Sequence, residues 1–455
     1  MTEPEPARRG AVRSTYAGMP RAGLAACMIL AMTAFALSDE KKLDQFEVIF
    51  NKPMCRQYFY QSPILDRHIP PQIIYSKPSN VYCTELDLNG ESNNNIISAF
   101  RNMLKAGPIS KIDIAFFAVD DFDFVDLICD AIARNGASLR VVVRADAWGE
   151  ALDRLQACLK TQGIEWTSEK LKKIGNVGSI GAFHLKIMLI EYKDNTPSVL
   201  VFGSGNPAGG VKLYFDNWNI IKTNSQEPIM RKHLCILDKL FIAPEPRSFR
   251  SFGQRFSPCF DQAAENDGHS IETFLLPLHR LGLMRTLRSL AMGSTSIDIA
   301  IHKVGEAQIR DLLLAALKRG IKVRLIVDDD LFWSSDFDTG FSTNSEYILW
   351  LRPILEAGAD VRYFQTNHHC RIGNLFHHKF AIFYSLNGPV VLTGGANFTR
   401  AAFSGRRFAN YENAYLIRNA AAVASYVTAY DGYWNDLATT PEGMPSLDSS
   451  DFRTR

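Results

Sequence analysis

The sequence of 455 residues lacks several features that mark common classes of protein. None of its eight cysteines forms a Cys-x-x-Cys pair, so the usual spacing of a zinc site is absent. Its net charge is only +2, whereas proteins that bind nucleic acid without sequence preference carry a basic excess or patch. Composition predicts disorder only at the ends, and a hydrophobic content of 46% is enough for two sizeable cores.

The chain also lacks an apolar run long enough to cross a bilayer. Residues 1–22 carry four arginines, and residues 23–37 are fifteen uncharged residues, whereas a membrane span needs about 20. Small residues around Ser38 offer a cleavage point. We therefore expect residues 1–38 to be a cleaved export signal, with a retained membrane anchor as the alternative. The expected location is secreted or periplasmic.

Export would permit disulfide bonds. We expect Cys129 and Cys158, which lie in apolar helical patterns, to be buried free thiols. Candidate disulfides join two other pairs, Cys55 with Cys83 and Cys235 with Cys259.

A short histidine motif occurs twice in the chain. His184 and Lys186 are two residues apart in an apolar run that predicts a strand, and so are His377 and Lys379. Successive side chains of a strand point to opposite faces, so each His and Lys share one face. His378 would lie on the other face, and we expect it to be structural.

A glycine-rich turn that ends in asparagine follows each motif. The first reads Gly203-Ser204-Gly205-Asn206 and the second Gly394-Gly395-Ala396-Asn397. Backbone amides and an asparagine in such a turn can meet an anion. Two imidazoles, two ammonium groups and two carboxamides suit a phosphodiester, so we predict a single composite site at the junction of the two copies.

The repeat extends well beyond these motifs, because predicted strands and helices follow in the same order. The first copy has strand 110–117, helix 125–134, strand 139–144, helix 151–161 and strand 164–166; the second has strand 296–301, helix 309–318, strand 321–327, helix 347–357 and strand 360–364. This order predicts an α/β class with a mixed or parallel sheet and helices on both faces. A period near 190 residues indicates duplicated domains. The segments are an extension (39–90), a first repeat (91–243), a linker (244–270), a second repeat (271–440) and a tail (441–455).

The doubled motif resembles the signature of the phospholipase D superfamily, which is His-x-Lys, four residues, Asp, and then Gly-Ser-x-Asn. The resemblance covers about residues 91–440 and implies two duplicated α/β/α sandwich domains with one shared active site at their interface. Three positions depart from the signature. The family Asp is Glu191 in the first copy and Tyr384 in the second, and Gly395 stands where the first copy has the supporting residue Ser204.

The resemblance implies a mechanism with two histidines. We assign attack on phosphorus to His184 and protonation of the leaving oxygen to His377, the order common in two-repeat members of the family. The groups expected to hold the nonbridging oxygens are Lys186, Lys379, Asn206 and Asn397. The mechanism needs no metal and no cofactor.

A carboxylate is expected to hold each imidazole in one tautomer. By the family pattern, Glu412 is predicted to orient His377. His184 has two candidates, Asp216 and Glu191.

Other segments offer further candidates for the site. His302 and Lys303 follow a predicted strand and are candidates for its mouth. His368 and His369 are expected to belong to a loop, and residues 328–330 to a solvated acidic turn, without binding a metal.

Two basic segments have a structural interpretation. Residues 247–256 interleave Arg and Phe, and we expect a linker whose Phe side chains pack on the repeats, with base stacking or lipid contact as the alternative. Residues 170–173 are expected to be a solvated helix end.

The sequence leaves the substrate between alternatives. Export, a net charge near zero and the acidic and aromatic residues of 328–333 favour phospholipid, so the first hypothesis is an exported phospholipase D. The residue pattern of the second motif favours a metal-independent endonuclease. The departures at Tyr384 and Gly395, with Asn219 in the first copy where the second copy has the acid Glu412, leave a third hypothesis, a phosphate-binding protein without turnover. We expect a monomer that acts at a phospholipid surface, with nucleic acid as the alternative partner and no obligate protein partner.

Overall fold

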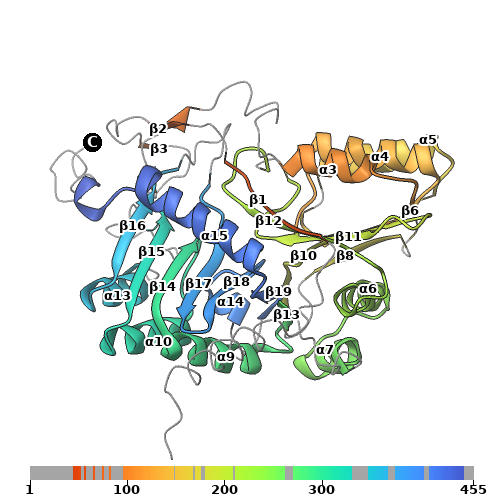
Figure 1. Cartoon of the computed structure of the whole chain (residues 1–455). Helices are drawn as coiled ribbons and strands as arrows, with labels where there is room; N and C mark the ends of the chain where they lie inside the picture. Colours follow the sequence, from red (N-terminus) through yellow and green to blue (C-terminus); the bar gives the residue numbers. More distant parts are fainter. Residues whose placement is uncertain are drawn as a thin grey trace, which may run out of the picture. The chain divides into compact units, whose positions relative to one another are not determined.

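The computed structural model describes residues 45–52, 56–57, 65–66, 74–75, 81–82, 96–147, 149–165, 167, 170–175, 180–208, 211–261, 270–329, 331, 347–366, 375–403 and 409–444. Several predictions fall outside these residues, namely the export signal, the Cys55–Cys83 pair, His368, His369, Asp330, Phe332 and Trp333. Residues Leu43–Arg455 form one compact unit, in which two large mixed sheets are the main elements (Figure 1).

The first sheet contains seven strands. Their order is β1 (Gln45–Phe50), β12 (Asn217–Thr223), β11 (Ser198–Gly203), β10 (Lys186–Tyr192), β6 (Ile109–Phe116), β7 (Ser138–Arg144) and β8 (Leu171–Ile174). Strands β6, β7 and β8 are parallel, and the other neighbours are antiparallel. Strand β1 belongs to the predicted extension, yet it completes this sheet.

The second sheet repeats the arrangement of the first. Its order is β13 (Ile271–Leu276), β19 (Ala409–Ile417), β18 (Gly388–Gly394), β17 (Lys379–Ser385), β14 (Ser294–Ile301), β15 (Lys322–Asp328) and β16 (Asp360–Phe364). An eighth strand, β9 (Ile180–Phe183), pairs with β19. The matching strand orders confirm the predicted α/β class.

Helices cover the outer face of each sheet (Figure 1). On the first sheet they are α3 (Ile96–Lys105), α4 (Phe122–Asn135) and α5 (Glu150–Thr161); on the second they are α9 (Arg280–Gly293), α10 (Ala307–Lys318) and the π-helical turn η1 (Tyr347–Leu351) followed by α13 (Arg352–Glu356). The ends of α4 follow from its sequence. Asp121 accepts a hydrogen bond from the amide of Phe124, and Gly136 ends the helix with a φ of 58°.

The inner faces of the two sheets share one hydrophobic cluster. In β10, Ile187 and Leu189 belong to this shared cluster, whereas Met188 and Ile190 pack under the outer helices of the first sheet. Strand β17 alternates in the same way. Helices that add side chains to the shared cluster are α6 (Pro228–Phe241), α7 (Phe249–Phe256) and α15 (Ala420–Gly432).

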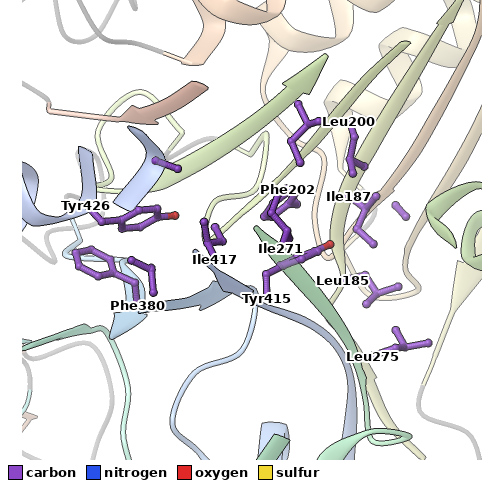
Figure 2. Packing of buried hydrophobic residues seen from close by; sticks show 14 of the residues in the cluster. Leu185, Ile187, Leu200, Phe202, Ile271, Leu275, Phe380, Tyr415, Ile417 and Tyr426 are labelled. Carbon is purple, nitrogen blue, oxygen red and sulfur yellow. The ribbon is translucent and has the colours of Figure 1, made fainter. Parts of the chain in front are cut away.

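Figure 2 shows where the two sheets meet. Phe202 of β11 stacks on Tyr415 of β19, with 3.8 Å between ring centroids. Phe380 of β17 meets Tyr426 of α15 edge to face at 5.0 Å. The first contact joins strands of the two repeats, so neither repeat buries its inner face alone, and the second packs α15 on a strand of its own repeat.

The edge of the first sheet differs from the prediction. Ile164 and Glu165 are irregular, and the edge strand is β8, in the segment expected to be a solvated helix end. Lys172 in this strand is buried, and its ammonium group contacts the carboxylate of Glu245 at 3.1 Å and the carbonyl of Ile242 at 3.1 Å. The hydrophobic pattern does not predict this strand, because a lysine occupies one of its buried positions.

One prediction for the cysteines is wrong and another is confirmed. Cys129 of α4 and Cys158 of α5 form a disulfide, so the expectation of free thiols is wrong. The two helices pack together, which brings the thiols within bonding reach. The predicted Cys235–Cys259 disulfide is confirmed; it links α6 to the short helix α8 (Pro258–Asp261).

The linker segment packs as expected. Phe252 and Phe256 are buried in the shared cluster, and the ring of Phe252 lies 4.8 Å from that of Tyr411. Short elements also follow β18 and α15, namely α14 (Arg400–Phe403), η2 (Tyr433–Leu437) and η3 (Pro441–Gly443). Within the described part of the chain, no helix combines the length and the apolar character that a bilayer span requires.

Candidate active site

The two His–Lys pairs lie where β10 and β17 begin. Strand β9 belongs to the first repeat but pairs in parallel with β19 of the second sheet. Beyond β9, the amide of His184 donates to the carbonyl of Tyr411 at 3.0 Å. The amide of Lys186 then donates to Oδ1 of Asn413 at 2.9 Å. The chain therefore carries His184 onto the second sheet before β10 returns to the first.

Each imidazole is held by a carboxylate from the other repeat. Nδ1 of His184 lies 2.7 Å from Oε2 of Glu412, and Nδ1 of His377 lies 2.8 Å from Oδ1 of Asp216. The prediction that Glu412 orients His377 is wrong, because β9 places His184 beside β19. Asp216, predicted as a candidate for His184, contacts His377 instead.

The other candidate for His184 lies away from the site. Glu191 is near the far end of β10, opposite Lys111 of β6, with 3.9 Å between its carboxylate and the ammonium group. Five residues of extended strand separate it from Lys186, which is roughly 16 Å at about 3.3 Å per residue. The suggestion that Glu191 orients His184 is therefore wrong.

Both lysines of the motifs are buried. Nζ of Lys379 donates to the carbonyl of His377 at 2.7 Å. Nζ of Lys186 lies 3.1 Å from the carbonyl oxygen of His184 and 3.2 Å from each of its ring nitrogens. Burial lowers the pKa of Lys186 to about 8, against the opposing charges of two carboxylates, and it lowers the pKa of Lys379 well below 10.5.

Burial also sets the charge state of the imidazoles. It lowers the pKa of His184 to about 4, although the charge of Glu412 opposes the shift. The pKa of His377 is lowered well below 6.5 by burial and then by the charges of Lys379 and Lys186. Both imidazoles are therefore neutral near pH 7, the form that a nitrogen nucleophile requires.

Both turns begin with glycine because the backbone of the neighbouring strand lies too close to leave room for a Cβ. A Cβ at Gly203 would lie 2.1 Å from the carbonyl oxygen of Asn217, and one at Gly394 would lie 2.3 Å from that of Asn413. These turns end in Asn206 and Asn397, which are half-buried; their Oδ1 atoms make no hydrogen bond within the described residues. Both carboxamides can therefore serve a ligand.

The comparisons with known proteins agree with this geometry. Residues 287–434 match the family model described as cardiolipin synthase, PLD-like domain. The mitochondrial cardiolipin hydrolase of Chlamydomonas reinhardtii is 28% identical over 153 residues, which cover 34% of this chain and 57% of that protein. These matches support membership of the phospholipase D superfamily. The human cardiolipin hydrolase is 26% identical over 165 residues, and the chain spans only 56% of its length.

A solved structure shows the same fold over most of the chain. Phosphatidylserine synthase of Haemophilus influenzae Rd KW20 is 13% identical with a TM-score of 0.51, and the match covers 76% of this chain and 86% of that protein. The arrangement of two sheets thus recurs in a protein of very different sequence.

One departure from the phospholipase D signature has a steric explanation. Oγ of Ser204 donates to Oδ1 of Asp216 at 2.6 Å. At the matching Gly395, a Cβ would lie 3.3 Å from Oε2 of Glu412 and 3.1 Å from the carbonyl oxygen of His184. Oδ1 of Asn413, at 3.0 Å, crowds the same position, so these three atoms together take the room that the serine occupies in the first copy.

Matching residues after the central strands flank the two imidazoles. The ring of Phe117, after β6, lies 4.9 Å from that of His184, and the ring of His302, after β14, lies 5.0 Å from that of His377. Lys303 is exposed, and its charge helps to lower the pKa of His377. His302 therefore lies beside the site, and Lys303 is close enough for its charge to act on His377. Tyr214, which was not predicted, lies 5.6 Å from His377 between ring centroids.

The acidic turn after β15 is not solvated as expected. Asp328 and Asp329 are fully buried, and both accept hydrogen bonds from Thr366. Asp328 also accepts the amide of Phe376 at 2.9 Å, so it fixes the segment that leads to His377. Within the described ranges, no group of three His, Cys, Asp or Glu residues is arranged to hold a metal.

Two more side chains lie close to the site, one predicted to be structural and one not predicted. The structural role expected for His378 is confirmed, because its buried ring packs against Phe376 and Phe380. Arg144, at the end of β7, was not predicted; its guanidinium carbon lies 4.1 Å from the ring centre of Phe117. A comparison of the repeats could have drawn attention to it, because its counterpart in the second copy is Asp328.

Proposed function

We propose that this protein is a phosphodiesterase that hydrolyses phospholipid headgroups, the reaction of a phospholipase D. The observation that carries the proposal is the pair of imidazole–carboxylate contacts, each of which joins one repeat to the other. Two buried lysines and two half-buried asparagines surround them. This constellation supplies two imidazoles and several hydrogen-bond donors to one phosphate.

The contacts of the imidazoles define their reactive atoms. Each Nδ1 faces a carboxylate, so the proton of the neutral ring is held there and Nε2 keeps its lone pair. In the proposed reaction, His377 first takes a proton from solvent. Nε2 of His184 then attacks phosphorus, and the bond from phosphorus to the headgroup oxygen breaks as His377 gives its proton to that oxygen. Water next attacks the phosphohistidine and the phosphorus–nitrogen bond breaks, while His377 takes a proton from that water and is ready for the next turnover.

The remaining polar groups stabilise charge in the transition state. Lys186 and Lys379 are held close to their own motif histidines, and burial strengthens their electrostatic effect on a bound anion. The Nδ2 groups of Asn206 and Asn397 would donate hydrogen bonds to the nonbridging oxygens. Ser204 supports the site by holding Asp216 in place.

Two observations support phospholipid as the substrate class. The relatives reported above are named cardiolipin hydrolases, and the matching family model is described as cardiolipin synthase. The net charge of +2 is small for a protein that must bind a polyanion. The nuclease hypothesis rests on the residue pattern of the second motif, and the assay below tests it with DNA.

The assay uses the purified chain from residue 39 with phosphatidylcholine vesicles, cardiolipin vesicles and single-stranded DNA, each with a chelator present. We expect hydrolysis of at least one phospholipid. Cleavage of DNA alone would assign a nuclease, and tight phosphate binding without turnover would assign a binding protein.

Two alanine variants test the composite site. His184→Ala and His377→Ala should each lower turnover at least a thousandfold, because each half of the site carries one motif imidazole. Glu191→Gln is the matched control, since Glu191 lies on the same strand as Lys186 but at its far end. More than a tenth of the activity in either histidine variant, with thermal unfolding unchanged, would contradict the mechanism.

We also propose that the protein is exported. Expression of the full chain with its N-terminal segment, followed by mass spectrometry of the product, should give a mature N-terminus at residue 39. An intact N-terminus on membrane-bound protein would support the retained anchor instead.

A further inference from the structure

The end of β7 carries a cation that the proposed reaction does not use. The amide of Arg144 donates to the carbonyl of Phe117 at 3.3 Å, and the amide of Phe117 donates to the carbonyl of Leu185 at 3.0 Å. These bonds fix the ends of β7 and β6 beside the first His–Lys motif. Phe117 packs edge-on against His184, and the guanidinium of Arg144 stacks on Phe117. One aromatic ring therefore separates the cation from the imidazole.

The guanidinium is available to a ligand. The side chain of Arg144 is 29% exposed, and its ion-pair partner Asp146 is 69% exposed. Water screens such a pair, so it contributes little stability and can exchange for another anion. Stacking on Phe117 holds the guanidinium plane, and a planar guanidinium can bind a phosphate through two parallel hydrogen bonds.

The second repeat has no such group at the matching place. The counterpart of Phe117 is His302, and that of Arg144 is Asp328, which is buried and hydrogen-bonded to Thr366 and the amide of Phe376. The composite site is therefore asymmetric. An arginine stacked on an aromatic ring flanks His184, and an imidazole flanks His377.

We propose that Phe117 and Arg144 form a subsite for a second phosphate group of the substrate. The scissile phosphate would lie between the motif lysines, and the chain that leads to the second phosphate would cross the ring of Phe117. Phospholipids whose two phosphates are joined by a glycerol bridge, as in cardiolipin, have this chemistry. The inference rests on the proposed function and narrows its substrate class.

The test compares two lipids with wild type and Arg144→Gln. Cardiolipin carries a second phosphate and phosphatidylglycerol does not, so each is presented at the same mole fraction in neutral detergent micelles. We expect the ratio of kcat/KM for cardiolipin to that for phosphatidylglycerol to fall about tenfold, the effect of losing roughly 1.4 kcal/mol of a charged hydrogen bond. Arg144→Lys should restore only part of the ratio, because an ammonium group cannot form the paired contact.

A matched control exists on α5. Arg154 lies over the ring of Phe122 at 5.6 Å and forms an ion pair with Asp126 at 2.6 Å, so it has the same kinds of partner as Arg144. Arg154→Gln should leave the ratio unchanged. Asp146→Asn should act in the opposite direction to Arg144→Gln and raise the ratio, because it removes the carboxylate that competes for Arg144.

The remaining outcomes separate this inference from the proposed function. An unchanged ratio in both Arg144→Gln and Asp146→Asn would overturn the subsite while phospholipid hydrolysis stands. Failure of the wild type to hydrolyse either lipid would overturn the proposed function and the subsite with it. A loss in Arg144→Gln confined to an oligonucleotide, measured against bis(p-nitrophenyl) phosphate, would show that Arg144 reads the neighbouring phosphate of a nucleic acid instead.

Discussion

At the scale of single residues, the exchanged carboxylates decide how the two imidazoles work. Glu412 comes from the second repeat and contacts His184 of the first, and its charge raises a pKa that burial lowers to about 4. Asn410 donates to the other oxygen of Glu412 at 3.2 Å. The carboxylate is therefore held from two sides, as a group that orients an imidazole must be.

Glu412→Gln should lower the pKa of His184 further, because the neutral amide no longer stabilises the protonated ring. The titration of imidazole protons by NMR measures this shift, and kcat should fall roughly 10 to 100-fold. The pH–rate profile should change at its acid limb. Asp216→Asn is the matched variant and should affect His377 instead. A shift in the pKa of His377 in Glu412→Gln would instead support the contact between Glu412 and His377 that the family pattern predicted.

The types of the site residues could be predicted from the sequence, but their partners could not. The spacing of His184 and Lys186 within a strand, and the repetition of that spacing, indicate a composite site. The pairing of His184 with Glu412 depends on β9 crossing to the second sheet, a long-range contact without a local signal. Arg144 was missed for a related reason, because its role depends on what lies beside the end of β7.

At the scale of elements, helix α7 in the linker supports the strand that carries Glu412. Phe252 and Phe256 are buried against Tyr411, the residue before Glu412 on β19. Tyr411 also accepts the amide of His184 through its carbonyl. The linker therefore contributes to the position of the site as well as joining the repeats.

Phe252→Ala should lower the free energy of unfolding by about 3 to 5 kcal/mol, because it leaves a cavity in the shared cluster. Urea denaturation measures the change, and kcat should fall with it as Tyr411 loses its support. Arg250→Ala on the exposed side of the same helix is the control and should change stability by less than about 0.5 kcal/mol. Loss of DNA cleavage in Arg250→Ala with unchanged stability would favour the base-stacking alternative.

Most central elements could be predicted because their hydrophobic patterns are strong. The alternate isoleucines of β6 and β14 pack under the outer helices, and the spacing in α4 and α10 buries one face of each helix, so local sequence and fold agree. Strand β8 was missed because Lys172 occupies a buried position, where Glu245 and a carbonyl satisfy its ammonium group. The residues that compensate this buried charge are distant in the sequence, so local sequence does not indicate the strand.

At the scale of the whole described unit, burial of histidine couples stability to pH. His233 of α6 is fully buried between the carbonyl of Ile229 and the hydroxyl of Tyr415, and burial lowers its pKa to about 4. Burial also lowers the pKa of His184 to about 4 and that of His378 to about 3. These residues lie in or beside the cluster that the two sheets share.

The sign of the pH effect follows from proton uptake. The unfolded chain protonates these histidines near pH 6.5, whereas the folded protein does so only near pH 4 or below. Stability should therefore be constant above about pH 7 and fall as the pH drops from 6.5 towards 4, by up to about 3 kcal/mol for each group. The raised pKa of Asp216 acts in the opposite direction.

Urea midpoints measured between pH 8 and pH 4.5 at constant ionic strength test this expectation. His233→Gln should flatten the dependence, because it removes one proton that the unfolded state takes up and lies outside the motifs. Its effect on stability at pH 8 is separate, since both states are then neutral at this position and only the hydrogen bonds to Ile229 and Tyr415 change. A pH dependence that is the same in the wild type and in His233→Gln would show that burial does not hold His233 neutral, and the same argument for a neutral His184 would lose its support.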